Sequence, residues 1–109
     1  MAYDERLAER VRKALARRKG LTERKMFGGI GFMLRGNLCC GVMKDELILR
    51  LGPEAAEEAM KKKGARAFDF TGRTMKSMLM VGPAGYRGAK ALESWVRAAA
   101  DFAGNLEPK

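Results

Sequence analysis

Three short apolar runs separated by brief turns constrain the fold of this chain more than any other feature. The runs are Met26–Leu34, Leu38–Met43 and Glu46–Leu51, and the turns are Arg35-Gly36-Asn37 and Lys44-Asp45. Turns this short join antiparallel strands, because a parallel crossover needs a dozen or more residues. The sequence therefore predicts an antiparallel meander of three strands.

Segments with helical periodicity flank this meander, and a second hairpin follows it. The expected helices are Asp4–Lys19, ended by Gly20, a short helix that begins at Pro53 and ends before Gly64, and a last helix that carries Leu92–Ala103 and is capped at Gly104. The expected strands of the second hairpin are Ala67–Phe70 and Met75–Val81. Hairpins and amphipathic helices in this order predict a two-layer α+β fold, with an antiparallel sheet and helices on one side, in the order α-β(3)-α-β(2)-α.

Length and composition limit the chemistry open to this chain. Its 109 residues suit one compact domain, which we place at residues 1–104 with a tail at 105–109. It contains no histidine, so Ser-His-Asp and Cys-His nucleophiles, His-ligated metals and histidine pH switches are excluded. The net charge of +9 favours phosphates or other polyanions as ligands. No catalytic, cofactor-binding or metal-binding residues are predicted.

The two cysteines, Cys39 and Cys40, are adjacent in the expected second strand. Neighbouring side chains of a regular strand leave on opposite faces, so a disulfide between them would need distorted geometry. We expect two reduced residues that lie in the core or are half-buried, with a redox role as the alternative.

The glycines of Gly28-Gly29-x-Gly31 could in principle let a backbone approach a phosphate. The spacing matches neither a dinucleotide fingerprint nor a P-loop, since no helix and no Gly-Lys-Ser/Thr follow. The sequence favours a structural role, a bulge or a close packing contact.

Two groups of basic residues are candidate anion contacts. On the first expected helix Arg6, Arg10, Lys13 and Arg17 form one stripe, and Arg87 and Lys90 lie where the last helix begins. Four phosphate contacts would give a log-log salt slope of about −3.6 on duplex DNA. The alternatives are a solvated helix face for the stripe and an ordinary connecting loop for the second group.

The block Met26-Phe27-Gly28-Gly29-x-Gly31, followed by Arg35-Gly36, then by Asp45-Glu46-Leu47-Ile48-Leu49-Arg50 and later by Phe68-Asp69-Phe70, resembles the N-terminal domain of the TfoX/Sxy family. The resemblance covers most of the chain and implies the same α-β(3)-α-β(2)-α arrangement. Its motif residues, taken as structural, are Met26, Phe27, Gly28, Gly29, Gly31 and Gly36. It brings no catalytic residues.

The TfoX and Sxy proteins are bacterial regulators of natural competence that act with a cyclic-AMP receptor transcription factor. The resemblance is to the N-terminal domain alone, without the C-terminal domain of these proteins. It implies a non-enzymatic regulatory or adaptor domain that acts through protein-protein contact. The partner protein is unknown, and the resemblance implies that it is a transcription regulator. The alternative is a basic domain that contacts nucleic-acid phosphates non-specifically. Self-association is open, and the absence of a long apolar run predicts no membrane contact and a cytoplasmic location.

Overall fold

The structure, a computed structural model, describes residues 3–26, 28–70 and 73–107, with the backbone alone at 69, 70 and 73–75. The elements in chain order are α1 (Glu5–Ala14), β1 (Leu21–Met26), β2 (Gly29–Leu34), β3 (Asn37–Met43), β4 (Glu46–Arg50), α2 (Pro53–Ala59), β5 (Ala65–Phe70), β6 (Arg73–Val81), α3 (Pro83–Tyr86) and α4 (Ala89–Gly104). The predicted α+β class is confirmed.

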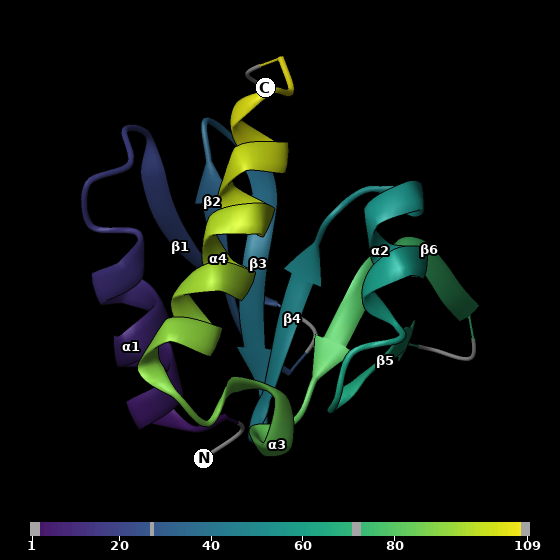
Figure 1. The fold of residues 1–109 in the computed structure, drawn as a ribbon. Helices are drawn as coiled ribbons and strands as arrows, with labels where there is room; N and C mark the ends of the chain where they lie inside the picture. Colours follow the sequence, from purple (N-terminus) through teal and green to yellow (C-terminus); the bar gives the residue numbers. More distant parts are fainter. Residues whose placement is uncertain (1–2, 27, 71–72, 108–109) are drawn as a thin grey trace.

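The six described strands form one sheet in the order β1-β2-β3-β4-β6-β5, and every neighbouring pair is antiparallel. Figure 1 shows α1, α2 and α4 on the same side of this sheet, as the sequence predicts. The main core lies between the sheet and these helices, where Val11, Val96 and Leu49 are among the fully buried side chains.

The opposite face of the sheet carries a second, smaller cluster. Residues that alternate with the main core along β4 and β6 build it together with one residue of β5, and Leu38 and Met43 pack against it. Its members are Ile48, Phe68, Met78 and Met80.

The meander has four strands and not three, because Leu21–Met26 forms the additional strand β1, which pairs with β2. The run Met26–Leu34, expected as one strand, is a hairpin in which Met26 pairs with Gly29 and Gly28 adopts a φ of +75°. Four of the six residues of β1 are exposed, so this edge strand lacks the apolar alternation on which strand prediction depends.

The first helix is shorter than predicted. It ends at Ala14, and tighter turns carry the chain to Arg18, whose N–H bonds to the carbonyl of Leu15. Gly20 has the expected left-handed φ of +77°, but it contacts the turn between β2 and β3 instead of capping the helix. The last helix runs through Gly104 and is capped by Asn105.

The adjacent cysteines share one core, which corrects the expectation that their side chains leave on opposite faces. Phe32 pairs with Cys40 and Met33 pairs with Leu38, so Cys39 is the extra residue of a β-bulge. A bulge breaks the alternation of the strand, and both thiols are fully buried in the main core.

Residues 105–107 are attached to the domain. Asn37, the one buried polar residue recorded for the described chain, donates from Nδ2 to the carbonyl oxygen of Glu107 at 2.8 Å. This bond holds the described part of the predicted tail against the turn between β2 and β3.

Candidate functional site

The predicted basic stripe begins on α1, where Arg6, Arg10 and Lys13 lie, and continues into the following turns with Arg17. Arg10 donates from Nη2 to the carbonyl oxygen of Tyr86 at 3.4 Å, and its guanidinium carbon lies 5.8 Å from the centre of the Tyr86 ring. Because Arg87 follows Tyr86, the structure brings the stripe together with the second predicted group of cations.

The surface between α1 and α4 is hollowed and strongly basic. Two hollows of about 450 and 360 Å³ share Arg18 and Ala100 in their linings, so they adjoin each other. We call the two together the basic groove, and its six cations are Lys13, Arg17, Arg18, Lys19, Arg35 and Arg97.

Few carboxylates compensate these cations. Glu93 and Asp101 are the acidic residues of the lining, and Asp101 is paired with Arg18 at 3.0 Å. In the part of the chain that the structure describes, no ion pair involves the other five cations of the basic groove. Their positive potential is therefore directed to solvent and available to an anion.

Four cations of the basic groove were missed by sequence reasoning, namely Arg18, Lys19, Arg35 and Arg97. Arg97 follows Lys90 by seven residues and Glu93 by four, so the helical period of α4 could have found it. Arg35 reaches the groove because its N–H bonds to the carbonyl of Gly20 at 3.0 Å. That contact joins two turns distant in sequence, and no local pattern reveals it.

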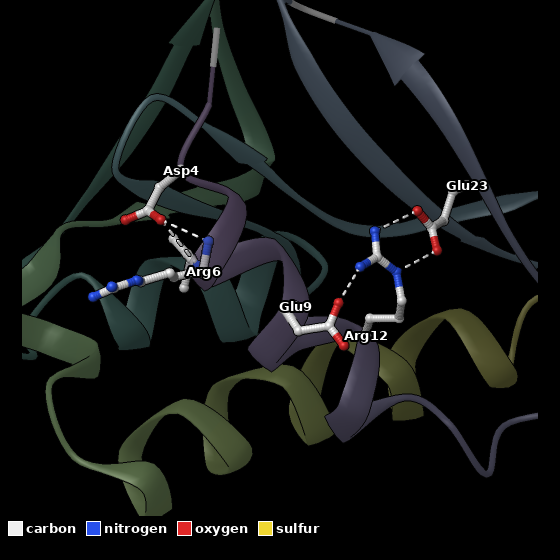
Figure 2. Close-up of polar contacts among 6 residues, drawn as sticks. Asp4, Arg6, Glu9, Arg12 and Glu23 are labelled. Carbon is white, nitrogen blue, oxygen red and sulfur yellow. Dashed lines mark hydrogen bonds and ion pairs between the residues drawn. The ribbon is translucent and has the colours of Figure 1, made fainter. Parts of the chain in front are cut away.

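On the opposite flank of α1, two glutamates neutralise the positive charge of an arginine (Figure 2). Arg12 donates to Glu23 of β1 at 2.7 and 2.8 Å and also contacts Glu9 at 2.5 Å. These hydrogen bonds raise the pKa of Arg12 and lower the pKa of Glu23. Arg6 points away from this cluster in Figure 2. Lys13 lines the hollow beside α4 and has no ion pair recorded in the described residues, so α1 carries a paired flank toward β1 and an unpaired flank toward α4.

The segment that connects β6 to α4 is fixed rather than open. It contains the short α3, which the sequence reading treated as loop. Tyr86 is buried and donates its hydroxyl to the carbonyl of Asp45 at 2.5 Å, while Trp95 Nε1 donates to the carbonyl of Gly85 at 3.0 Å. Arg87 and Lys90 remain exposed beside these anchors.

An apolar cleft of about 350 Å³ lies between α2 and the strands β5 and β6. Its lining is Pro53, Ala56, Glu57, Met60, Ala67, Lys76 and Met78. Met60 is 45% exposed and is the one large apolar side chain recorded as exposed in the described chain. Met78 and Met80 are both 5% exposed, so they belong mainly to the second core.

Two glycines of the motif, Gly29 and Gly31, pack closely against neighbouring atoms, as the sequence favours. A Cβ at Gly29 would lie 2.0 Å from the carbonyl oxygen of Val42, and one at Gly31 would lie 2.2 Å from Met26 Sδ. Gly36 provides a φ of +84° between β2 and β3. Phe27 lies outside the described residues.

The cysteines offer no exposed nucleophile. Both are free, and their hydrogen bond, together with burial, raises the pKa of Cys40 well above its ordinary value. Among residues 3–26, 28–70 and 73–107, no three metal-ligating side chains cluster.

An antiparallel sheet covered by helices on one face, with a basic groove and an apolar cleft on the surface, defines a small two-layer α+β domain. The family model of the TfoX N-terminal domain matches residues 13–103, and the chain belongs to that family. No curated protein and no solved structure matches the chain. None of the described helices combines the length and the apolar character that a bilayer span requires.

Proposed function

We propose that this chain is a small regulatory domain that acts by contact with a partner protein and not by catalysis. Membership of the TfoX N-terminal domain family supports this proposal, because the family resemblance implies regulation of competence or transcription. The deep burial of both thiols and the surface position of the hollows are consistent with a recognition role.

The observation that carries the proposal is the apolar cleft beside the edge strand β5. β5 pairs with β6 alone and ends the sheet, so its outer edge offers backbone groups to an added strand. Ala67 of β5 and the exposed Met60, the C-cap of α2, both line the adjoining cleft. Methionine adapts its shape to apolar partners, which suits a surface that receives a foreign side chain.

We infer that the occupant is an extended segment of a partner protein. The segment would pair with the β5 edge and insert an apolar side chain over Met60. The other edge strand, β1, presents exposed Thr22, Glu23, Arg24 and Lys25, and charges of this kind protect an edge from added strands.

The test is a pull-down from lysate with the wild-type chain, Met60→Lys and the matched control Ala98→Lys. Both positions are exposed, Met60 at the C-cap of α2 and Ala98 within α4, and Ala98 belongs to none of the described hollows. We expect a partner that persists after nuclease treatment, is retained by Ala98→Lys and is lost by Met60→Lys. Circular dichroism of both variants confirms that they are folded.

Loss of the partner after nuclease treatment, or its retention by Met60→Lys, would overturn the proposal. Sedimentation of the pure protein at two concentrations addresses self-association. A dimer that Met60→Lys dissociates would make a second copy of this chain the occupant, in place of a separate partner.

A further inference from the structure

We propose that the basic groove binds the phosphate backbone of duplex DNA. This inference concerns the surface between α1 and α4, whereas the proposed protein contact uses the cleft beside α2. Six cations and two carboxylates line the groove, and one of those carboxylates is already paired with Arg18. Five cations without a recorded ion partner therefore line the two adjoining hollows of the groove.

The spread of positive charge suits a linear polyanion. The α4 residues that line the groove run from Glu93 to Gly104, and Lys19 and Arg35 line the same hollow as Asp101 and Gly104. This stretch of helix corresponds to about 18 Å at a rise of about 1.5 Å per residue. A duplex advances about 3.4 Å per base pair, so the groove matches the phosphates of about five base pairs.

The groove favours a backbone over bases. Proteins that hold single strands stack the bases on exposed aromatic rings. No aromatic residue lines either described hollow of the groove, and the nearby Tyr86 and Trp95 are 7% and 8% exposed. A duplex exposes its phosphates without requiring such platforms.

The two flanks of α1 support the assignment. Arg12 is held by Glu9 and Glu23, which is how this molecule neutralises an arginine that serves the fold. Lys13 and Arg17, on the other flank, have no ion pair recorded in the described residues. Leaving these charges uncompensated around a hollow carries a repulsive cost that an anionic ligand would remove.

The experiment measures the affinity of the wild-type protein for a labelled 20-base-pair duplex of mixed sequence, by fluorescence anisotropy, between 50 and 200 mM salt. Five phosphate contacts give a log-log slope of about −4.5, which is a loss of about 500-fold in affinity over this range. The triple variant Lys13→Gln, Arg17→Gln, Arg97→Gln keeps two contacts. It should show a slope of about −1.8 and a loss of about 12-fold.

The matched control is the triple variant Arg24→Gln, Lys25→Gln, Lys63→Gln. It removes the same number of exposed positive charges from positions outside the groove, so we expect it to keep the wild-type slope. Thermal unfolding checks that both variants are folded.

Four results would overturn the proposal. They are no binding at 50 mM salt, equal loss in the groove and control variants, tighter binding of a single-stranded oligonucleotide or an RNA duplex, and displacement of DNA by an equimolar acidic peptide of equal charge. The Met60→Lys variant should bind DNA as the wild type does, because Met60 lies outside the basic groove. The DNA-binding proposal and the protein-contact proposal can therefore fail independently of each other.

Discussion

The two faces of the sheet are closed by different means, although the same strands supply both. On the helix-covered face, aliphatic side chains such as Leu47 and Leu79 pack against α1, α2 and α4. On the other face, Ile48 and Met80 belong to a cluster of four buried residues, and no described helix packs over them. The first face should therefore be sensitive to lost volume, while the methionines of the second face can shift to fill a gap.

The largest predicted effect breaks this simple contrast, because it comes from a close approach of backbones between β2 and β3 and not from the packing of either face. Gly29→Val would place Cβ 2.0 Å from the carbonyl oxygen of Val42 and 3.1 Å from the Cα of Met43. Backbone atoms of a paired strand cannot move aside as a side chain can. We expect the free energy of unfolding to fall by on the order of 3 kcal/mol or more. Circular dichroism would detect this as a lower midpoint of thermal unfolding.

The control for this variant is Gly104→Ala. That glycine lies at the end of α4 with nothing within 4 Å of its Cβ position, so alanine should leave the midpoint unchanged or raise it slightly. An unaltered midpoint in Gly29→Val would contradict the close approach of β2 and β3.

The second prediction compares neighbours in β6 that face opposite ways. Leu79→Ala removes a fully buried side chain from the main core, and we expect it to cost about 4 kcal/mol. Met80→Ala, in the smaller cluster, should cost about 2 kcal/mol, since its adaptable neighbours collapse into the space. Urea unfolding of both variants measures the difference, and equal costs would show that the two faces are equally rigid.

Short turns and alternating apolar residues were enough to predict the antiparallel hairpins and the single helical layer, because these follow from local spacing. β1 was missed because its residues are largely charged and exposed, so only pairing with β2 defines it. The bulge at Cys39 depends on the register against Phe32, which is a property of two strands together.

The predicted stripe of cations follows from local spacing along one helix, whereas Arg35, which was missed, depends on a contact between distant segments. Helical spacing placed Arg10 and Lys13 on one stripe of α1, and the structure keeps them there. Arg35 belongs to the basic groove only because its turn lies against Gly20, a contact made by tertiary folding. The groove as a whole could therefore be read only from the structure.

The third prediction concerns the polar contacts at the rim of the helix-covered face. Tyr86→Phe removes the hydrogen bond to the Asp45 carbonyl and leaves that acceptor without its donor, so we expect a cost of about 1 kcal/mol in urea unfolding. Tyr3→Phe is the control, since Tyr3 is half-buried and has no recorded side-chain hydrogen bond among the described residues. Equal costs would assign the effect to the aromatic ring and not to the bond.

The smallest predicted effect concerns the ion pair by which Arg12 of α1 contacts Glu23 of β1. The pair is partly exposed, so Arg12→Gln should cost about 0.5 kcal/mol at pH 7. Hydrogen bonds from Arg12 lower the pKa of Glu23 in the folded protein. The contribution is therefore complete above the unfolded value of about 4.3 and is lost as the pH falls through the folded value.

The stability difference between wild type and Arg12→Gln should accordingly be constant from pH 7 to about pH 5 and shrink at lower pH. Thermal midpoints measured across this range test it, with Lys13→Gln as a control for loss of one positive charge on the same helix without loss of a recorded ion pair. Arg12 also lies 6.0 Å from the centre of the Phe32 ring. If the stability difference persists undiminished to pH 3, the stabilisation comes from the contact of Arg12 with the Phe32 ring and not from its pairing with Glu23. The contact between α1 and β1 would then depend on packing, as the main core does.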